Sequence, residues 1–257
     1  MSREDRRKAL KLAEKALIGG LDATNTDPYV MVAYTREMHR LIENAKRSGN
    51  VDPVARYFYG KVDGTIKKAG NISIACTKGC SHCCNTWVGV NALEIFHIAK
   101  IVRQRPATVA KIKAAHEATK SHNLEIRFQH PFPCPLLEND ACSIYLDRPH
   151  PCRFAASADA DICARAYRNI TDEAIPTPTL YRRGGSANAI AMVMALKAAG
   201  LSYRTYELNG ALNRALERED IETAWLGGED VFAGLLIDPN NVFSNPNISA
   251  LYDLAFG

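Results

Sequence analysis

The chain has 257 residues, of which 47% are hydrophobic and 23% charged, a balance typical of a globular protein with a sizeable core. Its net charge of +4 is too small to indicate nucleic-acid binding by itself. Residues 205–257 hold nine acids against two bases, so the positive excess lies earlier in the chain. Such a gradient is typical of a solvated surface, and steering of an acidic partner is the alternative.

The sequence contains no recognisable targeting or spanning segment. The N-terminal stretch MSREDRRKALKLAEKALIGG has no apolar core long enough for a signal peptide, and no other stretch approaches a membrane span. We therefore expect a cytoplasmic protein with neither a membrane nor a nucleic acid as partner. Disulfides are rare in a reducing compartment, so the eight cysteines favour metal ligation or redox chemistry.

The first predicted region, residues 1–70, is helical. DRRKALKLAEKALIGG places apolar residues at helical spacing and ends at two glycines, which predicts a first helix. Asp27 is placed to cap a second helix with Pro28 at its first position. A third helix is predicted over residues 53–69.

The second predicted region, residues 71–168, holds all eight cysteines. NISIA alternates like a short strand, and helices are predicted over NALEIFHIAKIVRQR and over residues 107–128. HPFPCPLLENDACSIYLDRPHPCRF contains five prolines, which break helices. It is therefore predicted as an ordered loop with a short strand at residues 142–146.

A polar pattern marks the helix after the first cysteines. Glu94, His97 and Lys100 recur at every third position. Glu94-x-x-His97 has the spacing of a di-iron carboxylate half-site, but no second Glu-x-x-His occurs in the chain. We therefore predict a polar stripe on the surface of this helix.

The third predicted region, residues 169–257, opens with a loop, TDEAIPTPTLYRRGG. Helices are predicted at residues 187–199, 203–218 and 248–255, separated by turns rich in Gly or in Asn and Pro. The three regions together predict a mainly α fold, with helices around an irregular cysteine-rich metal-binding core and little β structure.

Cysteine spacing carries the main functional signal. The order is Cys76-x3-Cys80-x2-Cys83-Cys84, then Cys134-x7-Cys142-x9-Cys152-x10-Cys163. A tight loop can direct several thiolates at one zinc ion or iron–sulfur cluster, so all eight are candidate ligands. Adjacent side chains point in different directions in most backbones. Cys83 and Cys84 are therefore expected to serve different centres, unless one of them is not a ligand.

A four-thiolate site carries a net charge near −2, which needs cations or N–H donors nearby when it is buried. Lys78, Arg148 and Arg153 are the candidate cofactor-binding cations, and Arg165 and Arg168 also lie close to cysteines in the sequence. Three histidines belong to the same region. His82 is an alternative ligand to a thiolate, whereas His130 and His150 are expected to support the ligands or lie on the surface.

The first cysteine cluster, formed by Cys76, Cys80, Cys83 and Cys84, and the segment CPLLENDACSIYLDRPHPCRF resemble the YkgJ-like cysteine-cluster family. That family has eight cysteines, a first cluster ending in Cys-Cys and a later Cys-Pro…Cys-x-Ile-Tyr-x-x-Arg-Pro-x-x-Cys-Arg segment. The eight cysteines match that pattern, together with Pro135, Ile144, Tyr145, Arg148, Pro149 and Arg153. The resemblance covers about residues 72–165, with one departure: three residues separate Cys76 from Cys80, where the family has two.

The resemblance implies metal or iron–sulfur binding without a single reaction. Some members of the family are linked to an iron–sulfur-dependent lysine methylation of flagellin, so a methyltransferase role is an alternative. The Cys-x3-Cys-x2-Cys spacing is also that of radical S-adenosylmethionine enzymes, and GGED at residues 227–230 resembles their glycine–glycine–glutamate element. Against this alternative, the repeated β–α pattern is absent, and a glycine pair is expected where a helix ends.

We therefore predict a metal-binding protein that holds an iron–sulfur cluster, of the 4Fe-4S type. The cluster would serve electron transfer or assist a modification reaction, with an unidentified protein partner or electron donor. A structural zinc module for protein–protein interaction is the alternative. Simple zinc modules repeat Cys-x2-Cys pairs, but here only Cys80 and Cys83 form one. A cluster accepts one tight group plus a distant cysteine, which favours iron–sulfur.

Overall fold

The computed structural model describes residues 3–17, 19–22, 27–77, 79–168, 171–235 and 242–257. Their backbone is mainly helical, as predicted. The helices are α1 (Arg3–Ala16), α2 (Pro28–Ser48), α3 (Asp52–Lys68), α4 (Ala92–Val102), α5 (Pro106–Thr119), α6 (Leu124–Gln129), α7 (His150–Phe154), α8 (Ala160–Ala166), α9 (Thr179–Ala198), α10 (Leu208–Glu217), α11 (Ile221–Leu226) and α12 (Pro246–Phe256). The strands are β1 (Gly89–Asn91), β2 (Leu137–Glu138), β3 (Ala141–Cys142) and β4 (Thr205–Glu207), and the 3-10 turns are η1 (His82–Asn85), η2 (Tyr145–Asp147) and η3 (Val242–Ser244). No helix in this described part of the chain is long and apolar enough to cross a membrane.

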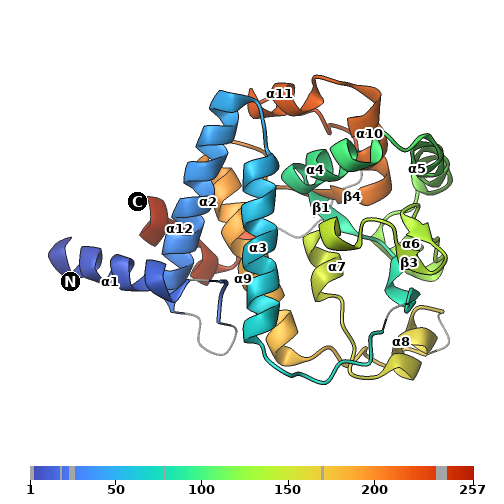
Figure 1. Ribbon diagram of the computed structural model, residues 1–257, viewed down its shortest axis with the longest axis horizontal. Coiled ribbons are helices and arrows are strands. Elements are labelled where there is room, and N and C mark those ends of the chain that lie inside the picture. Colours follow the sequence, from blue (N-terminus) through green and yellow to red (C-terminus); the bar gives the residue numbers. More distant parts are fainter. Residues whose placement is uncertain (1–2, 18, 23–26, 78, 169–170, 236–241) are drawn as a thin grey trace.

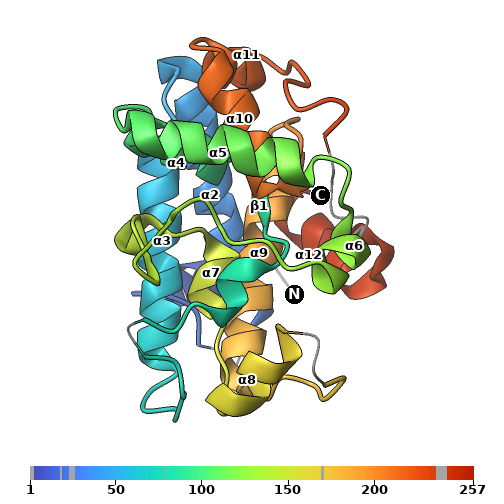
Figure 2. The ribbon, with the colours of Figure 1, turned by 90° about the vertical axis from the view of Figure 1, so that its right-hand side faces the viewer.

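Helices α2, α3 and α9 form the frame of the molecule and run side by side in both views (Figures 1 and 2). The predicted start of α2 is confirmed, because the Asp27 carboxylate accepts the Tyr29 N–H at 2.7 Å. A buried polar contact joins the three helices. The Tyr34 hydroxyl donates to Asn188 Oδ1 at 3.1 Å, and Asn188 Nδ2 donates to Thr65 Oγ1 at 3.2 Å.

The loop between α1 and α2 packs directly on the backbone of α3. A Cβ at Gly64 would lie 1.1 Å from the Gly19 carbonyl oxygen, so only a glycine permits this approach. The Leu21 N–H donates to the Thr65 hydroxyl at 2.9 Å, which satisfies a buried backbone group of the loop. The glycine therefore fixes where the N-terminal segment meets the frame.

A second group of helices, α4, α5 and α10, packs beside the frame. Strand β1 leads into α4 and pairs antiparallel with β4, which leads into α10, so the two helices start side by side. The apolar core continues into α11, where the Trp225 and Phe96 rings lie 5.4 Å apart.

Several predicted boundaries are wrong. NISIA, at residues 71–75, is not a strand, and the helix predicted over residues 107–128 divides into α5 and α6. The helix predicted over residues 203–218 begins only at Leu208, because Thr205–Glu207 form β4 and pair with β1. The loop predicted before α9 is too long. Gly185 lies inside this helix, where a Cβ would meet the Phe154 ring at 3.0 Å.

The proline-rich segment is also more structured than predicted. β3 covers only Ala141–Cys142, and η2 follows it instead of a longer strand. A short helix, α7, forms although prolines were expected to exclude helix. Pro151 lies in its first turn, where a residue needs no N–H for a helical hydrogen bond.

Candidate metal centre

The cysteine-bearing segments gather on one side of α3, where Figure 1 shows α7, α8 and β3 together. Backbone hydrogen bonds join them. The Cys134 N–H donates to the Cys84 carbonyl at 2.7 Å, and the Phe132 N–H donates to the Asn85 carbonyl at 2.8 Å. On the other side of the first cluster, the Ala75 N–H donates to the Ser157 carbonyl at 2.8 Å. Segments that are far apart in the sequence therefore meet at the first cluster.

The eight thiols form two groups that influence each other electrostatically. The first group is Cys83, Cys84, Cys134, Cys142 and Cys152. The hydrogen bond with Cys83 is the main cause of the raised pKa of Cys84, whereas burial is the main cause for Cys134, Cys142 and Cys152; neighbouring sulfurs of the group raise all four pKa values further. The second group is Cys76, Cys80 and Cys163, and Cys83 acts on Cys163 as well. Cys83 thus links the two groups. Among the described residues, no three Cys, His, Asp or Glu side chains are already arranged around a single-ion position.

The adjacent cysteines do not point apart, contrary to expectation. The 3-10 turn η1 brings the Cys83 and Cys84 thiols within hydrogen-bonding reach of each other. The hydrogen bond from Cys84 lowers the pKa of Cys83 to about 7, and the same bond raises the pKa of Cys84. Cys83 is therefore the thiol of this pair that ionises first.

Backbone N–H groups of other residues point at three of the sulfurs. The Leu136 N–H donates to Cys134 and the Ile144 N–H donates to Cys142, each from two residues further along the chain. The Ser157 N–H donates to Cys76 Sγ at 3.5 Å. Such bonds stabilise a thiolate, because they place positive dipole ends next to the sulfur.

A tight hairpin positions two of these cysteines. β2 and β3 pair with Leu137 opposite Cys142, and the turn between them is Asn139–Asp140. Both turn residues have positive φ, 50° and 58°, a conformation that Asn and Asp tolerate better than most residues. The hairpin folds the chain back so that Cys142 returns toward Cys134.

The predicted cations are placed differently from one another. Lys78 lies outside the described residues. The Arg148 guanidinium lies 4.0 Å from the centre of the Tyr145 ring, and its buried Nε has no acceptor among the described residues. The Arg148 charge adds to the hydrogen bond from Cys84 in lowering the pKa of Cys83, and it partly opposes the burial that raises the pKa of Cys142. Arg148 therefore faces the first thiol group.

Arg153 is buried and fully engaged by the protein. Its Nη1 contacts Asp63 Oδ1 at 2.7 Å, its Nε donates to the Arg148 carbonyl at 2.8 Å, and its Nη2 donates to the Leu146 carbonyl. The side chain therefore ties the segment around Arg148 to α3.

The histidines occupy different positions. His82 precedes Cys83 in η1, and His130 is exposed. The His150 ring packs between Phe58 and Phe154, with Nε2 3.0 Å from the Gly185 carbonyl oxygen. Burial lowers the pKa of His150 to about 4. His150 thus supports α7, the helix that carries Cys152.

The predicted surface stripe is wrong for Glu94 and His97, which are 1% and 7% exposed. Glu94 accepts the His150 N–H at 2.6 Å and a hydrogen bond from Asn91, so its carboxylate holds the first residue of α7. Burial raises the pKa of Glu94 to about 7. The sequence predicted a surface position for Glu94 because its hydrogen-bond partner, His150, is far away in the sequence.

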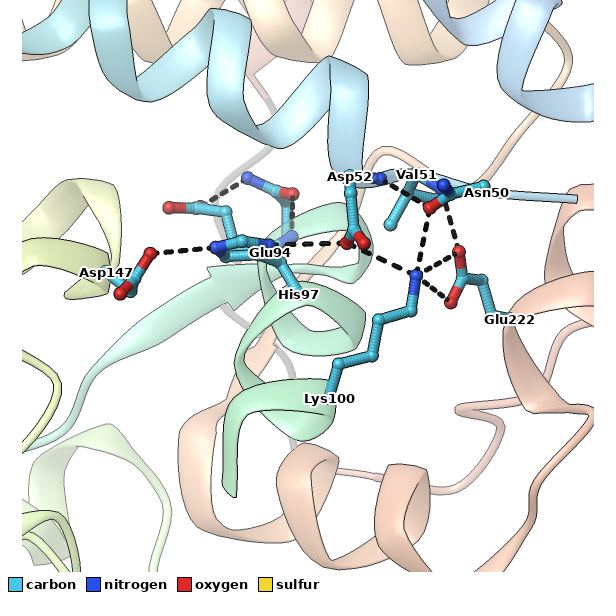
Figure 3. A network of polar contacts seen from close by, with 9 residues as sticks. Asn50, Val51, Asp52, Glu94, His97, Lys100, Asp147 and Glu222 are labelled. Carbon is cyan, nitrogen blue, oxygen red and sulfur yellow. Dashed lines mark hydrogen bonds and ion pairs between the residues drawn. The ribbon is translucent and has the colours of Figure 1, made fainter. Parts of the chain in front are cut away.

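His97 lies between two carboxylates (Figure 3). Its Nδ1 is 3.3 Å from Asp52 Oδ1 at the start of α3, and its Nε2 is 3.0 Å from Asp147 Oδ1 in η2. Lys100 lies at the surface as predicted, where it contacts Asp52 and Glu222. Helix α4 therefore contacts the chain between Cys142 and Cys152 at two points, through His97 and through Glu94.

A cavity of about 530 Å³ opens beside the first cluster. Its wall includes His82 and Asn85, which flank Cys83 and Cys84 in η1, and Tyr167 at the end of α8. After burial, the nearby Cys83 thiol is the largest cause that raises the pKa of Tyr167. The cavity therefore reaches the region of the thiols from the solvent side.

The glycine pair of GGED ends a helix, as predicted. Gly227 follows α11 and donates its N–H to the Thr223 carbonyl, and Gly228 has φ 95°. This confirms the helix-ending role of the pair.

Comparison with known proteins identifies the cysteine-bearing segment. Residues 75–173 match the CxxCxxCC family, described as "Putative zinc- or iron-chelating domain". The match confirms the resemblance, includes all eight cysteines and supports metal binding. No curated protein and no solved structure was found to match the chain.

Proposed function

We propose that this chain, whose residues 75–173 match the CxxCxxCC family, binds an iron–sulfur cluster through its cysteine thiolates. The cluster serves electron transfer or assists a modification reaction, in exchange with an electron donor or protein partner. One observation carries the proposal: backbone hydrogen bonds from Cys134 to Cys84 and from Ala75 to Ser157 bring thiols from segments far apart in the sequence into one neighbourhood.

The environment of the sulfurs favours a metal over free thiolates. Burial raises the pKa of Cys134 to about 12 and that of Cys163 to about 11, so both thiols hold their protons at neutral pH. A metal displaces such protons, because its positive charge stabilises the thiolate in place of water. The N–H donors at Cys76, Cys134 and Cys142 support the charged form as well.

An iron–sulfur cluster fits the spacing better than a single zinc ion. Cys76, Cys80 and Cys83 form one tight group, and a cysteine of the later segment completes a set of four. Cys163 supports this choice, since its thiol interacts electrostatically with Cys76, Cys80 and Cys83. When bound, a cluster supplies one-electron redox chemistry, and the cavity beside η1 gives a partner access to that side.

Anaerobic purification with iron, sulfide and zinc analysis tests the proposal. We expect a brown protein with broad absorption near ~400 nm that bleaches on reduction. Cys80→Ser and Cys83→Ser should each reduce bound metal, whereas Ser81→Ala, between them, should keep it. A colourless protein with stoichiometric zinc would overturn the cluster and leave the ligands in place. Full retention of metal in both cysteine variants would overturn the ligand assignment.

A further inference from the structure

Arg127 is the most deeply buried arginine of the cysteine-bearing region, with 2% of its surface exposed. Its Nη2 donates to the Thr86 carbonyl at 3.0 Å and to the Phe132 carbonyl at 3.5 Å. Its Nε and Nη1 are buried and have no acceptor among the described residues. A guanidinium is always charged in proteins, so burying it with two unsatisfied nitrogens is costly unless an anion lies nearby.

Two acidic groups act on Arg127, Glu207 and the Cys134 thiol. Within the described part of the chain, Arg127 forms no ion pair with Glu207 at 4 Å or less. Glu207 is already engaged at the start of α10, where it accepts the Gly210 N–H at 2.8 Å. Cys134 accepts a backbone N–H as well, from Leu136. Among the described residues neither acidic group forms an ion pair, so Glu207 and Cys134 are both candidate partners of the guanidinium.

The carbonyls that hold Arg127 come from the segments that carry the cysteines. Thr86 follows Cys84 by two residues, and Phe132 precedes Cys134 by two. These segments are joined by the backbone bond from Cys134 to Cys84. The guanidinium thus sits at the junction of the first cluster with the proline-rich segment.

We propose that Arg127 is a built-in counter-cation of the thiolate centre, paired in this role with Arg148. The inference rests on the proposed function. A site of four thiolates with Zn²⁺ or a four-iron cluster carries a net charge near −2, and two guanidiniums offset about that charge. Arg148 acts on Cys83 and Cys142, and Arg127 acts on Cys134. Both arginines present a buried, unpartnered Nε.

The simpler alternative is that Arg127 only neutralises the buried carboxylate of Glu207. The two roles differ in what a double substitution does. Arg127→Met with Glu207→Gln removes both charges, and the glutamine still accepts the Gly210 N–H. If Arg127 serves Glu207 alone, the double variant recovers wild-type metal affinity. If Arg127 serves the thiolates, it does not.

The test measures Zn²⁺ binding by competition with a chromophoric chelator, in wild type, Arg127→Met, Arg127→Lys and the double variant. Arg40→Met, which removes an exposed charge on α2, is the control. We expect Arg127→Met and the double variant to bind Zn²⁺ about 10–100-fold more weakly, a loss typical of residues that support ligands. Arg127→Lys keeps the charge and should lose less than Arg127→Met, and Arg40→Met should match wild type.

The outcomes separate this inference from the proposed function. Wild-type affinity in the double variant, with unfolding stability recovered, would overturn the role of Arg127 while metal binding stands. Equal losses in Arg127→Lys and Arg127→Met would overturn the charge argument. Wild-type protein that binds no metal through its cysteines would overturn the proposed function itself, and this inference with it.

Discussion

Glu94→Gln should change how the stability of the protein depends on pH. The pKa of Glu94 rises from 4.5 to about 7 on burial. Each pKa unit corresponds to about 1.4 kcal/mol, so ionising this carboxyl costs the folded state about 3 kcal/mol. Between these two pKa values the folded protein holds a proton that the unfolded chain has lost. The contribution of Glu94 to the free energy of unfolding therefore falls as pH rises from 4.5 to 7.

His150 has the opposite effect over nearly the same range. Burial lowers its pKa from 6.5 to about 4, so the unfolded chain binds a proton that the folded protein does not. The contribution of His150 to stability is therefore lost as pH falls from 6.5 to 4, by a similar amount. In the wild-type protein the two slopes largely cancel, and Glu94→Gln removes one of them.

Urea unfolding at several pH values between 4.5 and 7.5, performed without oxygen, measures the difference. The free energy of unfolding of Glu94→Gln relative to wild type should rise by about 3 kcal/mol across this range. Glutamine can still accept the His150 N–H, so α7 keeps its contact. Glu125→Gln, on the exposed side of α6, is the control and should follow wild type. Parallel curves for wild type and Glu94→Gln would refute the reasoning.

The remaining predictions concern the frame, the surface network and the metal. Gly64→Ala should lower the free energy of unfolding by about 1–3 kcal/mol or more, because the new Cβ would overlap the backbone of the Gly19 loop. On the same helix, a Cβ at Gly60 meets nothing within 4 Å, so Gly60→Ala should raise that free energy by about 0.5–1 kcal/mol. Equal melting temperatures for the two variants would contradict this. Lys100→Met should cost about 1 kcal/mol through loss of the contact with Glu222, and about 1 M salt should shrink the difference from wild type; a salt-independent difference would argue against an electrostatic origin. Anaerobic removal of metal should sharply lower the melting temperature and unprotect amides of residues 130–154 first, since structural metal contributes on the order of 10 kcal/mol; an unchanged melt would count against a structural metal.

Local signals in the sequence predicted the helical class and several helix ends. Asp27 caps α2 and the glycines after α11 end that helix, because a cap depends on residues within one turn. Gly185 shows where a local rule fails. A glycine in a loop-like stretch suggested an irregular segment, but it lies inside α9 because Phe154 packs against it. The conformation at Gly185 depends on a residue that is distant in the sequence, and the local stretch does not contain that information.

The sequence identified the thiols of the candidate site and missed the residues that support them, and the role of these thiols as metal ligands stays a prediction. Cysteine spacing pointed to the thiols, since ligands of one metal must converge and the chain shows this as short repeats. Glu94 was placed on a surface because its partner, His150, is brought to it only by the fold. Arg127 carries no signal of its own, since a single arginine in a short helix is ordinary until its burial is known.

The order in which the chain is synthesised determines when the frame of α2, α3 and α9 can form. α2 and α3 precede every cysteine, whereas α9, which completes the frame with them, begins at Thr179, after Cys163. A chain made from its N-terminus at about 5–20 residues per second therefore presents all eight thiols before α9 can dock. During this interval α7, which carries Cys152, lacks α9, the helix against which it packs. We expect the nascent chain to be open to metal loading and to oxidation in the same interval, and docking of α9 to end both.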